Sequence, residues 1–359
     1  MSRKHARLSP SSANIWLNCS ASVQPTNSNA SKKTTKSAVE GTLAHNVGEA
    51  ILNGEKDKLK QYMQNPNYSV DMIENVKPYT DYCLHRYKKL KEKYDEVGLK
   101  TERKIILEKY VPEGYGMADC LIYTRDYLEV VDLKYGLGVI VDIKNNPQLK
   151  LYALGALEKL TNIGCKIKTV RITVCQVRVD KKPKSIIIPV DELRDWGNLE
   201  VKPKAIEAYK EGGEFNAGEW CQFCRYKPIC GYRANLIIKQ AVEKLNVSVG
   251  IMNNLDIASL LEAKELLMPL FNSIENVARN KMMKGEEIEG YTLGKTSRRR
   301  DFVNEDLMAK DFEKAGYTDI YKLKTIKDLE KMMGKETFEK ISAPYTKWKE
   351  TKPSVKRRV

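Results

Sequence analysis

Two aspartates and a lysine lie on neighbouring segments whose apolar pattern is typical of strands. Asp119 ends Gly116-Met117-Ala118-Asp119, and Asp132 and Lys134 follow a short turn, in Val130-Val131-Asp132-Leu133-Lys134. Because side chains alternate along a strand, Asp132 and Lys134 should share a face, on which Asp119 can converge. Two carboxylates that face one point raise a pKa or recruit a cation such as Mg2+. Although Asp-x-Lys alone is common among ordinary surface charges, this set predicts a metal site, with Lys134 holding or helping to deprotonate an attacking water.

Two pairs of residues four positions apart could complete such a site from helices. His45 and Glu49 lie one turn apart on a predicted helix, and Gln148 and Tyr152 do so on another. An imidazole can bind a metal, while an amide and a phenol can hydrogen bond to a substrate. The alternative for both pairs is ordinary helix packing, because a single helical histidine is more often packed or capped than bound to a metal.

Three cysteines form a C-x2-C-x5-C run at Cys221, Cys224 and Cys230. In a reducing compartment such spacing predicts a metal site, and three thiolates need a fourth ligand. We predict Cys19, which ends a short N-terminal helix, as the fourth. The remaining four lie within predicted helices or strands and are expected to be small core residues: Cys83, Cys120, Cys165 and Cys175. Zinc and an iron-sulfur cluster both accept four thiolates, so the ligand set leaves both metals open.

The elements that must position these residues follow from periodicity and capping signals. We expect helices over residues 11–19, 38–52, 71–94 and 147–160. Strands are expected over residues 101–107, 117–123, 127–133, 168–179 and 185–189. This order predicts an α/β fold with a mixed sheet flanked by helices. After Cys230 the pattern is helical to the end, with a kink at Pro269 and a helix that Thr325 opens and Gly334 ends. The expected domains are 1–250 and a mainly helical 251–359 with a basic tail.

In these motifs the chain resembles the RecB/AddB-type branch of the PD-(D/E)xK nucleases, whose core is restriction-endonuclease-like. The resemblance rests on four ordered motifs: Gly41-Thr42-x-x-His45, Gly116-x-x-Asp119, Asp132-x-Lys134 and Gln148-x-x-x-Tyr152. It implies that Mg2+ or Mn2+ is held by His45, Asp119, Asp132 and the main-chain carbonyl of Leu133. It also implies that Lys134 is the catalytic lysine and that Gln148 and Tyr152 contact the active site or the DNA strand.

Two departures from that family's pattern are present: no proline precedes Asp119, and Asp132 stands where glutamate is common. Glu102, at the start of the first predicted strand, is a candidate for a further acidic ligand, but a strand-end charge is the preferred interpretation. The cysteine arrangement is similar to the iron-sulfur staple of AddB-type and CRISPR-adaptation nucleases. It implies a [4Fe-4S] cluster on Cys19, Cys221, Cys224 and Cys230, with Zn2+ as the other occupant. Residues 8–19 and 146–155 also resemble an uncharacterised prophage-borne family of this nuclease class.

The charge of the chain favours a polyanionic partner. Its 359 residues carry 62 Lys and Arg against 47 Asp and Glu, a net charge of +15. Basic residues gather before Glu40, at Arg298-Arg299-Arg300, and after Lys347. Counterion release at such residues would favour DNA, although a basic tail is equally typical of a solvated chain end. We expect no membrane segment, because the apolar runs are shorter than the about 18 to 20 residues required. Without a secretory signal, the expected location is the cytoplasm of a bacterial host, with the gene carried by a phage or prophage.

The predicted function is that of a metal-dependent deoxyribonuclease, an exonuclease or end-processing enzyme in phage DNA replication, recombination or repair. DNA is the expected partner, and a single-strand-binding, recombinase or helicase protein of the phage is a further candidate. The alternative is a catalytically silent module of the same fold that binds DNA or a recombination partner. Asp119, Asp132 and Lys134 favour the enzyme, because a binding role gives no reason to face two acids toward phosphate.

Overall fold

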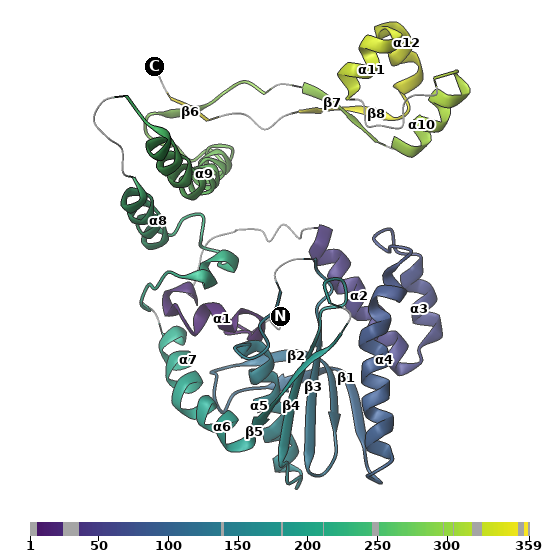
Figure 1. Cartoon of the computed structure of the whole chain (residues 1–359), viewed down its shortest axis with the longest axis vertical. Helices are drawn as coiled ribbons and strands as arrows, with labels where there is room; N and C mark the ends of the chain where they lie inside the picture. Colours follow the sequence, from purple (N-terminus) through teal and green to yellow (C-terminus); the bar gives the residue numbers. More distant parts are fainter. Residues whose placement is uncertain are drawn as a thin grey trace. The chain divides into compact units, whose positions relative to one another are not determined.

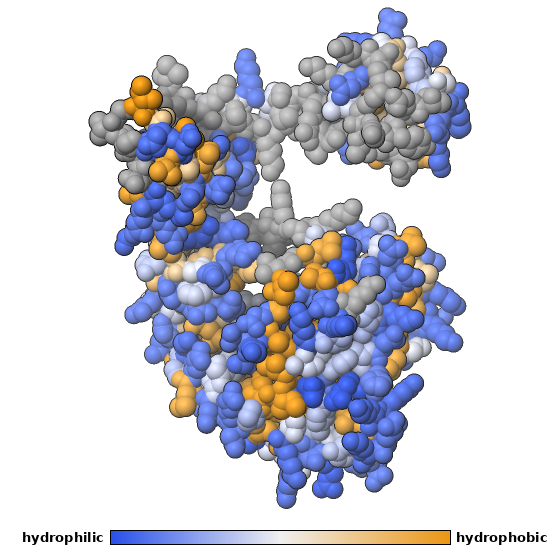
Figure 2. All heavy atoms as spheres, viewed as in Figure 1, coloured by the Kyte–Doolittle hydropathy of each residue, from blue (hydrophilic) through white to orange (hydrophobic). Residues whose placement is uncertain are grey.

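The computed structural model describes residues 6–23, 36–137, 140–180, 182–210, 212–245, 251–296, 298–303, 305–317, 325–350 and 355–357. The chain divides into two compact units, residues 1–236 and 237–359. In the described residues no helix combines the length and apolar character needed to cross a membrane. The face of the first unit seen in Figure 2 is largely hydrophilic, with one hydrophobic strip down its middle.

A five-stranded sheet forms the centre of the first unit, in the order β1-β2-β3-β4-β5 (Figure 1). The strands are β1 Gly98–Ile106, β2 Tyr115–Tyr123, β3 Tyr127–Leu133, β4 Thr169–Cys175 and β5 Lys184–Pro189. Strands β3 and β4 pair in parallel, and the other neighbours pair antiparallel. The predicted α/β fold with a mixed sheet is therefore confirmed.

Helices cover both faces of this sheet, and the sheet separates two apolar cores. On one face, α2 Lys36–Asn53 and α4 Met72–Lys91 pack with β2 and β3. On the other face, α5 Pro147–Asn162 packs with β1, β3 and β4. Helix α5 also connects the two parallel strands, a connection that requires a crossover. Helix α3 Lys56–Met63, which the sequence pattern did not predict, follows α2.

Helix α5 begins where its sequence signal places it. The side chain of Asn146 accepts a hydrogen bond from the backbone N–H of Leu149 at 3.1 Å, and Pro147 is the first helical residue. Most of the helix is buried, as expected from its apolar sides. A Cβ added at Gly155 would lie 2.4 Å from Ile105 and 2.7 Å from the carbonyl oxygen of Ile106. Glycine is needed there because α5 passes so close to β1.

Shorter elements complete the first unit. The predicted helix over residues 11–19 is instead a 3-10 turn, η1 Pro10–Ser12, followed by one helical turn, α1 Ala13–Trp16. The other short elements are η2 Ser20–Val23, α6 Val190–Asp195, η3 Trp196–Val201, α7 Lys202–Tyr209, η4 Glu219–Phe223 and α8 Gly231–Lys244, which continues past residue 236.

The second unit contains strands that the helical pattern did not predict. Helices α9 Asn254–Met282, α10 Glu305–Lys314, α11 Ile326–Met333 and α12 Lys335–Ser342 accompany β6 Tyr291–Leu293, β7 Arg298–Phe302, β8 Thr346–Glu350 and β9 Val355–Arg357. These strands form two antiparallel pairs, β6 with β9 and β7 with β8. Their partners are distant in the sequence and the strands are short, so local periodicity carries no signal of them.

Several local predictions for the second unit are confirmed. Thr325 caps α11 in a reciprocal capping box with Asp328, and Gly334 ends that helix. Pro269 lies inside α9, and the kink expected there stays a prediction. The side chains of Arg298-Arg299-Arg300, and part of the basic tail after Lys347, lie outside the described residues.

Candidate metal centre

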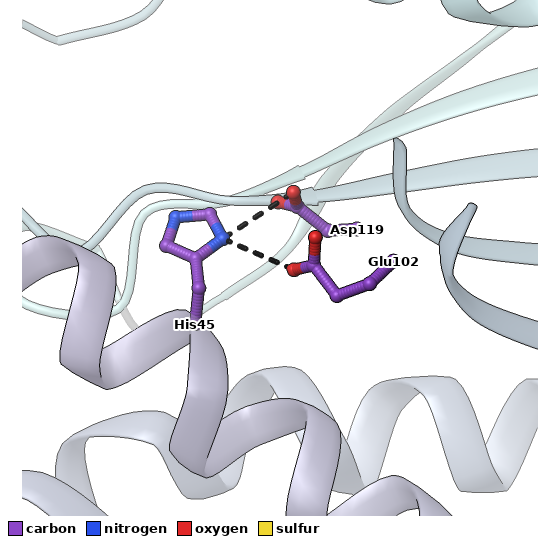
Figure 3. Close-up of side chains that lie close together, drawn as sticks. All are labelled: His45, Glu102 and Asp119. Atoms are coloured by element: carbon purple, nitrogen blue, oxygen red, sulfur yellow. Dashed lines mark ion pairs between the residues drawn. The ribbon is translucent and has the colours of Figure 1, made fainter. Parts of the chain in front are cut away.

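Three potential metal ligands from helix α2 and strands β1 and β2 lie close together (Figure 3). His45 on α2 lies with its Nδ1 atom 3.3 Å from Oδ1 of Asp119 on β2. The same nitrogen is 3.9 Å from Oε1 of Glu102 on β1. One ligand atom from each residue lies within 4.8 Å of those from the other two, and no other such group of three occurs in the described residues. Adjacent ligands of an octahedral ion with bonds of about 2.1 Å are about 3 Å apart, so a small contraction would fit Mg2+ or Mn2+.

Strand register brings three carboxylates into one row. Thr101 pairs with Cys120 and Arg103 with Ala118, so Glu102 stands opposite Asp119. The pairing of β2 with β3 starts at Cys120 and Val131, so the next residues along, Asp119 and Asp132, also stand opposite each other. Glu102, Asp119 and Asp132 therefore occupy one level across β1, β2 and β3. Like charges at this spacing repel in the absence of a cation.

Glu102 has an unusual backbone conformation. Its φ of 43° lies in the left-handed region, which costs a residue with a side chain of the order of 1–3 kcal/mol. The paired register of β1 and β2 is interrupted at Glu102 and Asp119 and continues on either side of them. Strained residues in otherwise regular strands are concentrated at functional sites.

At the pair formed by Glu102 and Asp119, β1 and β2 each change the face of the sheet to which alternate side chains point. Leu99 and Ile105 are an even number of residues apart, yet Leu99 packs with α2 and α4 while Ile105 packs in the core beneath α5. On β2, Cys120 and Ala118 are two residues apart, yet Cys120 packs with α2 and α4 while Ala118 packs in the core beneath α5. A regular strand would keep each of these pairs on one face. The irregularity at Glu102 therefore lets both strands change face at the level of the three carboxylates.

Contacts from two further elements hold His45 and Asp119 in place. The Oδ2 atom of Asp119 accepts a hydrogen bond of 2.7 Å from the backbone N–H of Leu133. The carboxylate is thereby tied to the end of β3. Helix α2 is held by an ion pair of 3.2 Å between Glu40 and Arg178, which follows β4.

A second group of predicted residues adjoins these ligands. The Nζ atom of Lys134 is 2.9 Å from Oδ2 of Asp132 and donates to Oε1 of Gln148 at 3.1 Å. The amide nitrogen of Gln148 donates to the hydroxyl of Tyr152 at 3.3 Å. Asp132 is 2% exposed, so its charge depends on Lys134 for compensation. This chain of contacts places Lys134 between the row of carboxylates and α5.

The electrostatics of the centre match a site built for a cation. Burial works to lower the pKa of His45, but the charges of Asp119, Asp132 and Glu102 outweigh it and raise that pKa to about 9. Burial, together with the charge of Asp119, raises the pKa of Glu102 to about 7. Burial also raises the pKa of Asp132, against the opposing effect of Lys134. Without a metal, the protein is thus expected to bind protons where a cation would relieve the repulsion.

The pKa of Lys134 points to its chemical state. Burial would lower this pKa, but the adjacent charge of Asp132 outweighs burial and raises it. The ammonium group therefore stays protonated at neutral pH.

With this geometry in place, comparison with known proteins defines the family. Residues 5–357 match the family model described as "Protein of unknown function (DUF2800)". The chain belongs to this family. It is also similar to a solved structure described as "Crystal structure of SSO0001", at 15% identity, over 54% of this chain and 85% of that chain, with a TM-score of 0.26. A likeness of this size carries no argument about the fold or activity of the DUF2800 protein.

Each predicted active-site residue of this DUF2800 protein lies in one of the two adjoining groups. His45 and Asp119 belong to the three-ligand group, and Asp132, Lys134, Gln148 and Tyr152 form the neighbouring chain of contacts. For Leu133 the described contact is its N–H to Asp119, and its carbonyl remains a predicted ligand.

The interpretation of Glu102 as a strand-end charge is wrong. Glu102 lies inside β1, and its carboxylate is a member of the three-ligand group. The turn at Pro112-Glu113-Gly114 does not reveal this, because a hairpin centred on Glu113 would set Asp119 opposite Leu107. The observed register, with a longer connection between β1 and β2, sets Glu102 there.

The four predicted cysteine ligands line one pocket, but their sulfur atoms are not gathered into a close group. Cys19, Cys221, Cys224 and Cys230 all border this pocket. No three cysteine sulfurs among the described residues lie within 4.8 Å of one another. A tetrahedral zinc site with bonds of about 2.3 Å would bring its sulfurs to about 3.8 Å. The cysteines are therefore neighbours without the arrangement of a closed zinc site.

Backbone groups and burial act on these thiols. The N–H of Asn216 approaches Sγ of Cys19 at 3.5 Å, and the N–H of Arg233 approaches Sγ of Cys230 at the same distance. Burial raises the pKa of Cys224, and the other three thiols contribute to the shift. Donors directed at sulfur are typical of sites that hold thiolates against a metal.

Proposed function

We propose that this DUF2800 protein is a Mg2+- or Mn2+-dependent deoxyribonuclease of the PD-(D/E)xK class. The observation that carries the proposal is the row of Glu102, Asp119 and Asp132, which has His45 at one end and Lys134 at the other. A row of acids with an imidazole suits a hard divalent cation. A lysine beside it suits a reaction in which negative charge develops.

His45, Glu102 and Asp119 would hold the cation, together with Asp132. When bound, it would neutralise the phosphodiester and lower the pKa of a nearby water. The protein's own groups would orient the reaction. The Leu133 N–H fixes Asp119, and the Gln148 amide fixes Lys134.

Lys134 would act as a positioned cation rather than as a base. Its raised pKa keeps its charge, and Asp132 and Gln148 hold the ammonium at 2.9 Å and 3.1 Å. Such a group can donate hydrogen bonds to an attacking water or to a phosphate oxygen. It thus stabilises charge that develops in the transition state.

The decisive experiment is a cleavage assay on labelled single- and double-stranded DNA with Mg2+, Mn2+ or EDTA. We expect cleavage with either metal and none in EDTA. Asp132→Ala and Lys134→Ala should each lower the rate by about 100-fold or more. Unchanged activity in both variants would refute the site. Absence of activity under every condition would instead favour the alternative, a silent DNA-binding or recombination module.

We propose further that Cys19, Cys221, Cys224 and Cys230 hold a [4Fe-4S] cluster. What supports it is that the four thiols surround one pocket with sulfurs spaced more widely than zinc requires. Cys19 is far in sequence from the other three, so the cluster would close a long loop of the nuclease unit. Because hydrolysis needs no redox step, its role would be structural.

Anaerobic purification followed by absorption spectroscopy and metal analysis tests this second proposal. A brown protein that absorbs near about 400 nm and contains about four iron atoms per chain is expected. Replacement of Cys19 by serine should lower the iron content and the thermal stability together. A colourless protein with stoichiometric zinc would overturn the proposal. The setting we propose is DNA replication, recombination or repair of a phage or prophage.

A further inference from the structure

A second pocket adjoins the cysteine pocket in the first unit. We call it the serine pocket. It encloses about 300 Å3 and is bordered by the N-terminal segment and by the residues on either side of Cys224. Its lining includes Arg7, Ser9, Ser11, Ser12, Phe223 and Arg225. The volume lies at the lower end of the range for pockets that bind small ligands.

The lining of the serine pocket is cationic and rich in hydroxyl groups. The Oγ atom of Ser9 lies 2.9 Å from that of Ser12 and 3.2 Å from that of Ser11, so the three hydroxyls form one cluster. Two arginines border the pocket, and none of its described lining residues is an acid. By contrast, the pocket beside Asp95 and Glu96 and the pocket beside Glu102 both include carboxylates. The chemistry of the serine pocket suits an anion that accepts several hydrogen bonds.

One donor in the serine pocket is buried without a partner. The Nη2 atom of Arg7 is buried and makes no hydrogen bond within the part of the chain that the structure describes. The same guanidinium is otherwise held, by the carbonyl oxygen of Val23 at 3.4 Å from Nε and by the ring of Tyr209 at 4.8 Å. A buried donor without a partner is costly, so Arg7 brings an incompletely satisfied guanidinium to the side of this pocket.

Phe223 adds an aromatic surface to the same pocket. Its side chain is 66% exposed, although it is a large apolar group. Arg225 is exposed on the other side of Cys224, and its guanidinium lies over the ring of Tyr226 at 4.8 Å. An exposed ring beside cationic groups is the combination by which proteins hold single nucleic-acid strands: the ring stacks on a base and the cations contact the backbone.

The serine pocket lies next to the candidate active site. A Cβ added at Gly116 would be 2.8 Å from Cγ of Pro10, which stands between Ser9 and Ser11, and 2.7 Å from Cε1 of Tyr152. Tyr152 in turn hydrogen bonds with Gln148, the partner of Lys134. The serine cluster and Lys134 are therefore connected through packed neighbours, Pro10, Tyr152 and Gln148.

We propose that the serine pocket is a subsite for one nucleotide of single-stranded DNA. Arg7, Arg225 and the serine hydroxyls contact its phosphate, and Phe223 stacks on its base. The inference rests on the proposed nuclease function for the identity of the ligand as DNA. It adds a single-strand preference and a place where the strand is gripped.

Binding without catalysis tests the subsite. Fluorescence anisotropy would measure the Kd of the full-length protein for a labelled oligothymidylate in EDTA, at several salt concentrations. We expect Phe223→Ala to weaken binding about 10-fold, as for the loss of one stacked base. Arg225→Gln should lower the slope of log affinity against log salt by about 0.7, as for one phosphate contact on a single strand. The matched controls Phe271→Ala and Arg125→Gln, which change exposed residues elsewhere, should leave both quantities unchanged.

Two further variants separate stacking from a folding defect. Phe223→Trp keeps an aromatic surface and should retain wild-type affinity, whereas Phe223→Leu keeps apolar bulk and should behave like Phe223→Ala. Equal Kd values for the wild type, Phe223→Leu and Arg225→Gln would overturn the subsite. Equal losses on duplex and single-stranded DNA would also overturn it, because paired bases are not available to Phe223.

The outcome is separable from that of the nuclease proposal. Metal-dependent cleavage with unchanged Kd values in the variants would remove the subsite and leave the nuclease. Weakened binding in EDTA, combined with a wild-type protein that never cleaves, would keep the subsite and remove the nuclease.

Discussion

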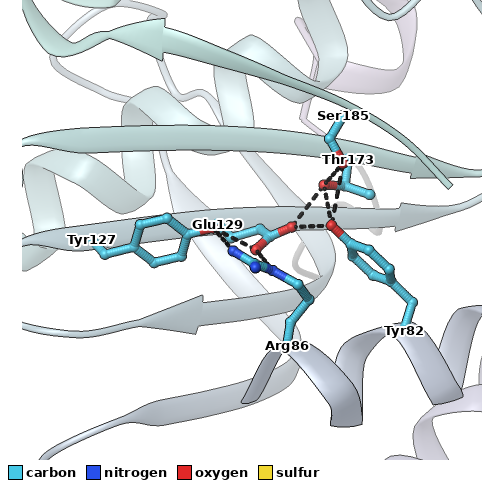
Figure 4. A network of polar contacts seen from close by, with 6 residues as sticks. All are labelled: Tyr82, Arg86, Tyr127, Glu129, Thr173 and Ser185. Atoms are coloured by element: carbon cyan, nitrogen blue, oxygen red, sulfur yellow. Dashed lines mark hydrogen bonds and ion pairs between the residues drawn. The ribbon is translucent and has the colours of Figure 1, made fainter. Parts of the chain in front are cut away.

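Two centres in the first unit are built around carboxylates, and they differ in how the charge is satisfied. On the α4 side, Glu129 is fully buried and accepts four hydrogen bonds, from Tyr82, Arg86, Tyr127 and Thr173 (Figure 4). The donor distances range from 2.6 to 2.9 Å. This group fastens α4 to the middle of the sheet.

The metal centre has the opposite balance. Three carboxylates share one level of the sheet, and the described cationic partners are His45 and Lys134. Glu102 and Asp119 keep 27% and 11% of their side-chain surface exposed, so a ligand can reach them. A carboxylate with a full set of donors stabilises the fold, whereas carboxylates that outnumber their donors are typical of a site that binds something else.

The largest expected difference between the two centres is in catalysis. Asp119→Asn should lower metal-dependent cleavage on the order of 1000-fold, because it removes a charge shared by His45 and the cation. Glu129→Gln should retain most of the activity per folded molecule, measured well below its unfolding temperature. The comparison fails if Glu129→Gln loses as much cleavage as Asp119→Asn while remaining folded.

Substitutions at Glu129 should lower the free energy of unfolding more than substitutions in the metal centre. Glu129→Ala leaves Arg86 without its buried partner and should lower the free energy of unfolding by about 3–5 kcal/mol. Glu102→Gln removes one of the repelling charges and should leave the metal-free protein at least as stable as the wild type. Urea denaturation in EDTA measures both. A large loss of stability in Glu102→Gln would show that Glu102 serves the fold and not the site.

The pH dependence should also belong to the metal centre. A raised pKa of about 7 for Glu102 makes the folded, metal-free protein hold a proton that the unfolded chain releases, so its stability falls as pH rises from about 4.5 to 7. The raised pKa of His45, about 9, continues that fall from about 6.5 to 9. Mn2+ displaces these protons, so its affinity should rise over the same interval.

Denaturation in EDTA and in Mn2+, at each pH, measures these effects. His45→Gln should flatten the metal-free curve above about pH 6.5, where the histidine of the unfolded chain loses its proton. If metal-free stability instead increases between pH 7 and 9, the assigned charges are wrong.

The smallest effects compare one tyrosine from each centre. Tyr82→Phe removes a donor to Glu129 and should cost about 1–2 kcal/mol of stability with no change in cleavage. Tyr152→Phe removes the acceptor of the Gln148 amide and should lower cleavage a few-fold through the position of Lys134. Thermal unfolding and cleavage rates are measured on both variants. A loss of cleavage in Tyr82→Phe, together with a loss of stability alone in Tyr152→Phe, would contradict this comparison.

Local rules predicted much of the first unit because its signals lie within a few residues. Strand alternation placed Asp132 and Lys134 together, and their atoms are 2.9 Å apart. The Asn146 cap and Pro147 marked the start of α5. The short strands of the second unit escaped prediction because β6 pairs with β9 and β7 with β8 across long stretches of chain.

Residue types and spacing by themselves determined which side chains could carry chemistry: a histidine, acids and a lysine in order along the chain, and four cysteines in a recognisable pattern. Only the tertiary structure decided that Glu102 joins them, because its position depends on the register of β1 against β2 and on a left-handed residue within a strand. It also decided that Glu129 is a structural acid, because its four donors come from α4, β3 and β4. Contacts between elements depend on packing free energy summed over the whole unit, and no short window of sequence contains that sum.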